Sequence, residues 1–288
     1  MTLDIKAISI PRFRRGILLA QESSLDIHSP RASIACAKEA ADRMPQRFNL
    51  DSVAFFGRTM EEYLQAFALS TSDLIGKRVL DCPSGPDSFV AQVNALGCDA
   101  VGVDLVYDKS AAELEAKGQA DITNCLAQMK AKPEFYPAMD FDQYSKSKTQ
   151  ALELFIADYK KNRKRYFHGS LPKLPFADRS FDIVLSAHLL FVYSPIEEDG
   201  YLKSGHSNPQ HFDLQWHHQA VREIARVSAR EIRLYPTAAM NSAPRRHRYI
   251  QPIMADLCAN GWRVAFEPSQ YHQLSTEMND CLVARRLS

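Results

Sequence analysis

The chain has 288 residues, of which 45% are apolar and 24% charged, an ordinary composition for a globular protein. Its formal net charge of +1 excludes an overall field that would attract nucleic acid. No apolar run reaches the ~20 residues of a membrane span, and the longest early one, residues 16–20, is too short for the core of a secretory signal. The six cysteines include no pair at two-residue spacing, which argues against a zinc ribbon, a dithiol redox site or a disulfide framework. We therefore expect a cytoplasmic protein without a membrane partner.

The beginning of the chain, residues 1–73, is predicted to form a helical extension that packs on the main domain. An amphipathic helix is expected over residues 33–44. Thr59 and Glu62 have the spacing of a capping box, in which each side chain accepts a hydrogen bond from the backbone of the other, so a second helix should begin there.

From residue 77 onward, short apolar runs alternate with helical segments, a pattern that predicts a mostly parallel sheet covered by helices on both faces. Strands are predicted over residues 78–82, 100–104, 165–168, 181–186, 231–235, 262–266 and 281–285, and helices over 89–96, 218–227 and 250–260. Gly97 and Gly261 are expected to end two of these helices. We predict a doubly wound α/β domain over residues 74–288.

The stretch between the strands that end at Asp104 and begin at Phe181 is much longer than a βαβ unit of about 30 residues requires. The strand at 165–168 uses part of it, and roughly residues 107–164 are predicted to be an inserted helical segment. Insertions at this end of a sheet lie near the ligand crevice. The segment could either cap the substrate or have a purely structural role.

The strand at 78–82 runs into a loop, residues 83–88, that opens a helix, so a ligand there would meet backbone N–H groups and a helix N-terminus. Gly85 has no Cβ and permits close approach. Asp104 ends the next strand about twenty residues after Asp81, the spacing at which an acidic residue accepts hydrogen bonds from ribose hydroxyls. The combination predicts a site for an adenosine-containing cofactor.

The loop also favours one such cofactor over another. A dinucleotide site needs the glycines of G-x-G-x-x-G, and only Gly85 is present. Asp87 lies beside the place that the phosphates would occupy, and a carboxylate there would repel a pyrophosphate. S-adenosylmethionine has no phosphate and carries an ammonium and a sulfonium. The sequence therefore favours S-adenosylmethionine over NAD.

Three blocks of this sequence resemble the class I S-adenosylmethionine-dependent methyltransferases of the small-molecule (type 11-like) group. They are VLDCPSG at 79–85, GVD at 102–104 and LPFADRSFDIVLS at 174–186, of which the third is the most specific. The resemblance covers roughly residues 74–288. It implies a Rossmann-like methyltransferase fold with a seven-stranded sheet whose last two strands form an antiparallel hairpin.

The resemblance also implies roles for individual residues: Asp81 to Gly85 would hold the methionine part of the donor, Asp104 the ribose, and Ser170 and Leu171 would flank the adenine. The cofactor-binding set that we predict is Asp81, Cys82, Pro83, Gly85, Ser88, Asp104, Leu105, Ser170, Leu171 and Ser186. The chain departs from the family where Pro83 and Asp87 replace the usual glycines and Ser170 replaces a common acidic residue. Proline removes a backbone N–H and fixes φ. The sequence therefore leaves undecided whether this loop binds S-adenosylmethionine more weakly than the family does.

Two candidate catalytic residues follow the strand at 181–186, whose carboxyl end should face the donor. His188 could accept a proton from a hydroxyl, amine or thiol as it attacks the methyl group, or it could be a structural residue that orients the following loop. Tyr193, in the same expected loop, could orient the acceptor.

A local cluster contains His206, His211, Asp213, His217 and His218, side chains that are suitable metal ligands. Their spacing matches no zinc signature, so we expect a polar loop over the substrate and assign no metal.

Two basic runs, residues 160–165 and 245–248, are typical of solvated faces. Tyr159 and Tyr166 flank the first run, so base stacking stays open.

The sequence predicts an enzyme that transfers a methyl group from S-adenosylmethionine to a nucleophilic atom of a small molecule, mainly by aligning that atom with the sulfonium methyl. The alternatives are an RNA-modifying methyltransferase that uses the basic runs, and a non-catalytic binding protein that keeps the fold with a degenerate donor loop. A nicotinamide oxidoreductase comes last. The acceptor and the oligomeric state are left open.

Overall fold

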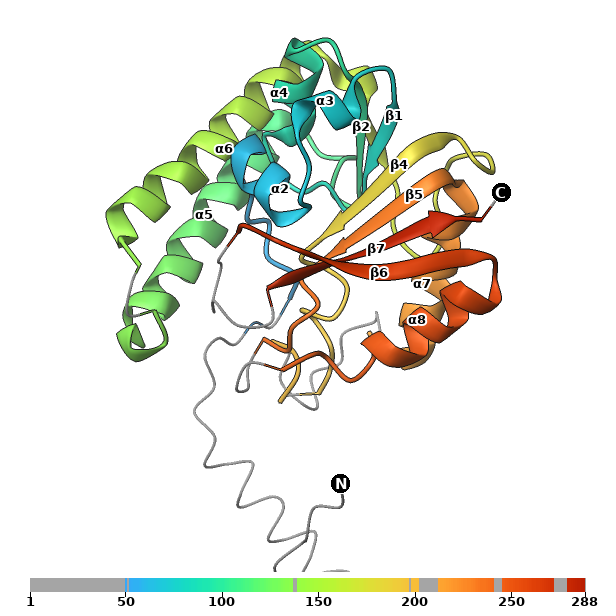
Figure 1. Ribbon diagram of the computed structural model, residues 1–288. Helices are drawn as coiled ribbons and strands as arrows, with labels where there is room; N and C mark the ends of the chain where they lie inside the picture. Colours follow the sequence, from blue (N-terminus) through green and yellow to red (C-terminus); the bar gives the residue numbers. More distant parts are fainter. Residues whose placement is uncertain are drawn as a thin grey trace, which may run out of the picture. The chain divides into compact units, whose positions relative to one another are not determined.

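The computed structural model in Figure 1 describes residues 50, 52–136, 139–196, 198–201, 212–240, 245–271 and 279–287. All of them belong to one of the two units into which the chain divides, Met44–Ser288. The other unit, Met1–Arg43, and the helix expected over residues 33–44 lie outside the described residues. The domain boundary at residue 73 stays a prediction.

The centre of this unit is a seven-stranded sheet with the spatial order β3-β2-β1-β4-β5-β7-β6. The strands are β1 Arg78–Asp81, β2 Asp99–Asp104, β3 Tyr166–His168, β4 Phe181–Ala187, β5 Ser228–Tyr235, β6 Trp262–Pro268 and β7 Asp280–Arg286. β1 to β5 pair in parallel, whereas β7 runs antiparallel to both β5 and β6. The doubly wound, mostly parallel sheet and its antiparallel last hairpin are confirmed.

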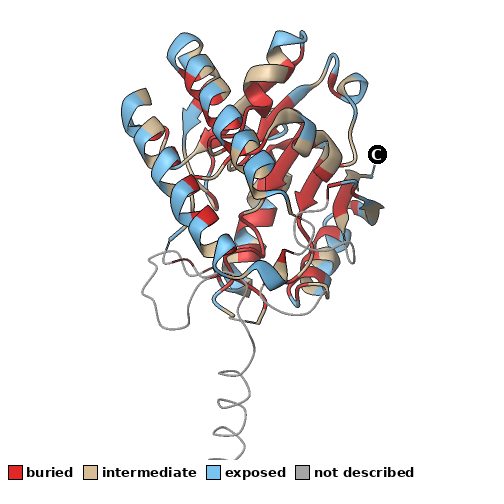
Figure 2. Cartoon of the chain, turned by 90° about the vertical axis from the view of Figure 1, so that its left-hand side faces the viewer, coloured by how far each residue is buried: buried red, intermediate tan, exposed pale blue. Residues whose placement is uncertain are grey.

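Helices cover both faces of the sheet (Figure 1). They are α2 Met60–Ala66, α3 Thr71–Leu74, α4 Phe89–Ala95, α5 Ala111–Lys130, α6 Phe141–Lys161, α7 Leu214–Val227 and α8 Ile250–Ala259. One apolar core joins Leu80 and Val184 to α7 and α8, and a second joins Val79 and Leu185 to α2, α4 and α6. Alternate strand residues thus face opposite cores, as the pleat requires. Figure 2 shows buried residues along the strands and exposed residues on the outer side of the long helices.

Several helix ends follow from local chemistry. The Thr59 hydroxyl accepts a hydrogen bond from the Glu62 N–H (3.2 Å) and the Glu62 carboxylate accepts one from the Thr59 N–H (2.8 Å), so the capping box is confirmed. Gly97 and Gly261 follow α4 and α8 with φ of +87° and +81°, the left-handed conformation that glycine adopts readily. α7 begins earlier than the predicted residue 218, because the Asp213 carboxylate accepts a hydrogen bond from the Trp216 N–H (2.8 Å) and caps it.

The long stretch between β2 and β3 contains two antiparallel-packed helices, α5 and α6, which match the predicted helical segment in type. Their axes approach closely where Gly118 of α5 meets Leu152 of α6, since a Cβ at Gly118 would lie 2.6 Å from the leucine side chain. No helix in the described part of the chain is both long and apolar enough to cross a bilayer.

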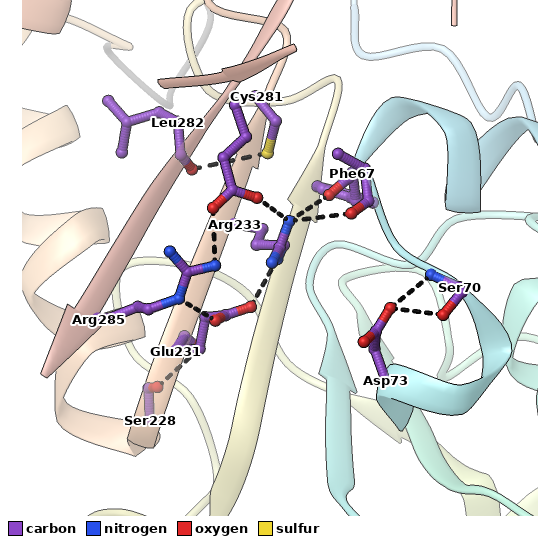
Figure 3. A network of polar contacts seen from close by, with 11 residues as sticks. Phe67, Ser70, Asp73, Ser228, Glu231, Arg233, Cys281, Leu282 and Arg285 are labelled. Carbon is purple, nitrogen blue, oxygen red and sulfur yellow. Dashed lines mark hydrogen bonds and ion pairs between the residues drawn. The ribbon is translucent and has the colours of Figure 1, made fainter. Parts of the chain in front are cut away.

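An ionic network centred on the buried Arg233 ties the end of α2 to the antiparallel strands of the sheet (Figure 3). Arg233 of β5 donates to the Phe67 carbonyl (2.6 Å) and pairs with Glu231 (2.5 Å) and Glu267 (2.9 Å). Arg285 of β7 reaches the same two carboxylates, each at 2.7 Å. Because Arg233 bonds the Phe67 carbonyl and both carboxylates from a buried position, Arg233 is a determinant of stability.

Candidate functional site

A cavity of about 490 Å³ opens where the order of the parallel strands reverses, at the carboxyl ends of β1, β2 and β4. This is where ligands bind in open α/β sheets, and the volume is ordinary for a small-molecule site. Most of the predicted site residues line it: Cys82, Pro83, Gly85, Asp104, Leu105, Ser170, Leu171, His188 and Tyr193. The remaining three, Asp81, Ser88 and Ser186, are buried behind the lining.

The loop after β1 and the end of β2 form one corner of the cavity. The Gly85 N–H donates to Asp104 Oδ2 (2.9 Å) and the Val106 N–H to Oδ1 (3.1 Å), so the carboxylate is fixed at the cavity wall. Gly85 has a φ of +53°, and a Cβ there would meet nothing within 4 Å. Burial raises the pKa of Asp104, although backbone hydrogen bonds from Val106, Gly85 and Leu105 oppose the rise. The corner presents one oriented carboxylate to a ligand.

Beneath this loop, two acidic side chains share a tyrosine. The Tyr63 hydroxyl lies 2.5 Å from Asp87 Oδ2 and 3.1 Å from Asp81 Oδ1, and all three side chains are buried. A phenol has one proton to donate, so it can serve only one of the two carboxylates at a time. Burial raises the pKa of Asp87 to about 7, and burial and the neighbouring Asp87 raise that of Asp81 well above its usual range. Both raised pKa values favour retention of a proton by this cluster near neutral pH.

One wall of the cavity is the 52–58 segment, the residues just before α2. Side chains from three other elements hold its backbone: the Ala54 N–H donates to the Tyr193 hydroxyl (3.1 Å), the Phe55 N–H to Asp121 (2.6 Å) and the Arg58 N–H to Asp87. The sequence does not predict this wall, because each of its hydrogen bonds joins residues far apart in the chain.

The same segment covers the start of α4. The Ser88 N–H donates to the Arg58 carbonyl (3.0 Å), and a Cβ on Gly57 would lie 2.2 Å from the Pro86 carbonyl oxygen. The Ser88 N–H at the helix N-terminus, where a pyrophosphate would bind, is thus already engaged in a hydrogen bond. Asp87 also points toward Arg58 and Tyr63, so the obstacle to a dinucleotide is this packing more than the carboxylate's charge.

Arg58 was not predicted as a site residue, yet it lines the cavity with only 6% of its surface exposed. Its guanidinium donates to the Phe56 carbonyl (3.3 Å), and its Nε has no hydrogen-bond partner among the described residues. A buried cation with an unused donor, beside a cavity, is suited to hold an anionic group of a ligand. No local signal marks it, because its position depends on contact with the distant Asp87.

His188 and Tyr193 both reach the cavity from the loop after β4. His188 has a φ of +55° and its N–H donates to the Tyr235 carbonyl (2.8 Å), which fixes the backbone. Its ring packs edge-on to Tyr235 at 5.3 Å. Burial raises the pKa of Tyr193, so this phenol stays protonated at neutral pH. The geometry brings a base and a hydroxyl to one side of the cavity.

The described part of the histidine cluster has structural partners. His217 is buried; its Nε2 accepts a hydrogen bond from the Phe191 N–H (2.9 Å), and burial lowers its pKa to about 4. His218 contacts Asp256 at 3.3 Å. His206 and His211 lie outside the described residues, and within the described ranges no three potential metal ligands gather.

The basic runs pair mostly within the chain. Arg163 donates to the carbonyls of Tyr166 and Tyr107 and lies 4.7 Å from the centre of the Tyr159 ring. The other pairs are Arg165–Asp158, Lys160–Glu115, Arg246–Asp280, and Arg245 and Arg248 with Asp199. Much of the charge of both runs is therefore balanced locally.

Comparison with known proteins gives a relative in sequence and several similar structures. No family model matches the chain. It is 30% identical over 242 residues to the uncharacterized protein MJ0045 of Methanocaldococcus jannaschii, an alignment that covers 83% of this chain and 98% of the relative.

Among solved structures, it is similar to a magnesium protoporphyrin IX methyltransferase from Synechocystis with bound S-adenosylmethionine (12% identity, TM-score 0.39, covering 92% of this chain and 86% of that one). It is also similar to a 1,6-didemethyltoxoflavin-N1-methyltransferase from Burkholderia thailandensis (10% identity, TM-score 0.38, covering 92% and 93%). The fold is assigned from the strand order and pairing of this chain itself. The chain belongs to the same family as the Methanocaldococcus protein, and its sheet is that of the class I methyltransferases.

Proposed function

We propose that this protein is an S-adenosylmethionine-dependent methyltransferase that acts on a small molecule. One observation carries the proposal: a single cavity joins the corner formed by Asp104 and Gly85 to the loop that bears His188 and Tyr193. A donor at the corner and an acceptor at the loop would share one enclosed space. That is the arrangement that direct transfer between two bound molecules requires.

The residues of the cavity fit the donor part by part. The fixed carboxylate of Asp104 is placed to accept hydrogen bonds from the ribose hydroxyls. Leu105 and Leu171 offer apolar surface to the adenine. Arg58, with its unused Nε donor, would pair with the methionine carboxylate. Pro83 and Asp87 do not close the corner, because Asp87 turns toward Tyr63 and the backbone of Arg58.

The chain's contribution to the reaction is alignment and removal of a proton. When bound, S-adenosylmethionine supplies an electrophilic methyl group on a sulfonium. His188 would accept the proton that the acceptor's nucleophilic atom releases. Tyr193 accepts a hydrogen bond from the Ala54 N–H, so its own proton is not used in that bond and can orient the acceptor. α5 contributes Lys117, Cys125 and Met129 to the lining, which supports the cap role of the inserted segment.

Calorimetric titration of the full chain tests the proposal. S-adenosylmethionine or its demethylated product should bind, and NAD should not. Asp104→Ala should weaken donor binding by about 1–3 kcal/mol, the scale for losing the partner of buried hydroxyls. Asp108→Ala is the matched control, because this carboxylate is exposed and outside the cavity. Binding of NAD with no binding of the methyl donor would overturn the proposal.

A further inference from the structure

Besides the donor corner, the cavity lining contains aromatic side chains that arrive from distant parts of the chain. Phe56 comes from the 52–58 segment, Tyr144 from α6, Tyr193 from the loop after β4, and Trp216 from α7. Met129 of α5 adds further apolar surface. Four different parts of the chain thus contribute aromatic rings to the same cavity.

The rings are fixed in position by one another. Phe56 and Tyr144 lie 6.1 Å apart between ring centres, inclined at 39°. Phe212, which is 1% exposed, packs edge-on to Trp216 at 4.6 Å and lies 6.4 Å from the Tyr193 ring. Aromatic side chains with such neighbours lose little conformational freedom when a ligand binds. They form pre-organised surfaces against which a flat ligand can stack.

The charged side chains of this space are engaged by neighbouring residues or would be engaged by the bound donor. The Lys117 ammonium lies 2.9 Å from Asp121, whose carboxylate also accepts the Phe55 N–H at 2.6 Å. Asp87 is engaged by Tyr63 and by the Arg58 backbone. With Asp104 and Arg58 taken by the ribose and the methionine carboxylate of the donor, as proposed above, an acceptor's ammonium or carboxylate would find no uncommitted Lys, Arg, Asp or Glu side chain within the described lining. Moving an unpaired ion from water into such a site is costly.

From these observations we infer that the acceptor is an uncharged, planar aromatic molecule that carries the hydroxyl or ring N–H to be methylated, and that the Phe56, Tyr144, Tyr193 and Trp216 rings select it. The inference rests on the proposed function. The acceptor's O–H or N–H proton goes to His188, its lone pair forms the bond to the methyl carbon, and the carbon–sulfur bond breaks with its electron pair returning to sulfur. Proton and charge balance, since the neutral acceptor becomes a neutral methylated product.

A cationic acceptor is the competing possibility, because aromatic rings also attract quaternary and protonated amines. Two features argue against it here. Once the donor's ribose occupies Asp104, the described lining offers such a cation no free carboxylate. An amine must also lose its proton before it can attack a methyl group. The experiment therefore compares one ring system in three charge states.

Fluorescence of Trp216 provides the measurement. The chain has two tryptophans, and the second, Trp262, is 2% exposed and packs beneath Arg286 outside the cavity. In the full chain with Trp262→Phe, Trp216 is the sole tryptophan. We titrate 2-naphthol, 2-naphthoate and 2-naphthylmethylammonium at neutral pH. 2-Naphthol should quench Trp216 and bind at least tenfold more tightly than either ion. Equal or tighter binding of an ion, or no binding of 2-naphthol, would overturn the inference.

Variants test the residues. Tyr144→Leu and Phe56→Leu keep apolar volume but remove a ring, and each should weaken 2-naphthol binding by about tenfold. Phe167→Leu, on β3 and outside the lining, should not. Donor binding is measured on the same samples by calorimetry. Loss of 2-naphthol selectivity with intact donor binding contradicts only the acceptor class, whereas absent donor binding with intact selectivity contradicts only methyl transfer.

Discussion

Replacing Asp87 by asparagine should remove a pH dependence from the stability of this protein. Burial raises the pKa of Asp87 from the ordinary 3.8 to about 7. Between about pH 4 and pH 7, Asp87 of the folded chain therefore keeps a proton that it releases in the unfolded chain. Stability from this group is complete below about pH 4 and is lost as pH rises through 7. At about 1.4 kcal/mol per pH unit, the loss is at most roughly 4 kcal/mol.

Asparagine is close to aspartic acid in shape, and its carbonyl oxygen can still accept the Arg58 N–H. The variant should therefore gain stability relative to the wild type as pH rises from 5 to 8. Urea unfolding at several pH values measures the difference, with Asp108→Asn as a control on an exposed carboxylate. If the free energy of unfolding varied with pH in the same way for the wild type and Asp87→Asn, the pKa of Asp87 would not be raised by its burial beside Tyr63.

Three further predictions separate stability, donor binding and catalysis. Arg233→Met should lower the free energy of unfolding by about 1–3 kcal/mol, because it leaves Glu231, Glu267 and the Phe67 carbonyl without one hydrogen-bond partner each, while calorimetry should show unchanged donor affinity in the folded protein. Arg58→Met should weaken donor binding at least tenfold by calorimetry, and Arg58→Lys should recover part of it; an unchanged affinity would remove Arg58 from the donor site. His188→Ala should lower turnover by roughly 10²–10⁴-fold with donor affinity almost unchanged, and His188→Asn should not restore it because an amide cannot take the proton. Recovery of both stability and turnover by asparagine would instead assign His188 a structural role.

The fold could be predicted because its signals are local. The capping box at Thr59, the glycines at 97 and 261, and the alternation of strands and helices depend on neighbouring residues alone, and the structure has them where expected. The sequence predicts the start of α7 too late, because Asp213 is also a potential member of the histidine cluster. Its carboxylate in fact caps the helix.

The candidate site was predictable only along β1, β2 and the loop after β4, where motifs mark it. Arg58 has no such mark, since its importance comes from a cavity that forms when the 52–58 segment crosses the loop after β1. The contributions of Tyr144 and Met129 were equally hidden, because the packing of α5 on α6 decides which side chains reach the cavity. Tertiary contacts, rather than local propensity, choose these residues.

Incubation with a labelled methyl donor asks whether this chain transfers a methyl group to a small molecule. The wild-type chain is incubated with methyl-labelled S-adenosylmethionine and with separate small-molecule and RNA fractions of a cell extract, and mass spectrometry locates the label. We expect label in a small molecule with wild-type protein and the Asp108→Ala control, and a strong loss of label with Asp104→Ala. Label in RNA alone, or labelling by Asp104→Ala equal to that of the wild type, would contradict it.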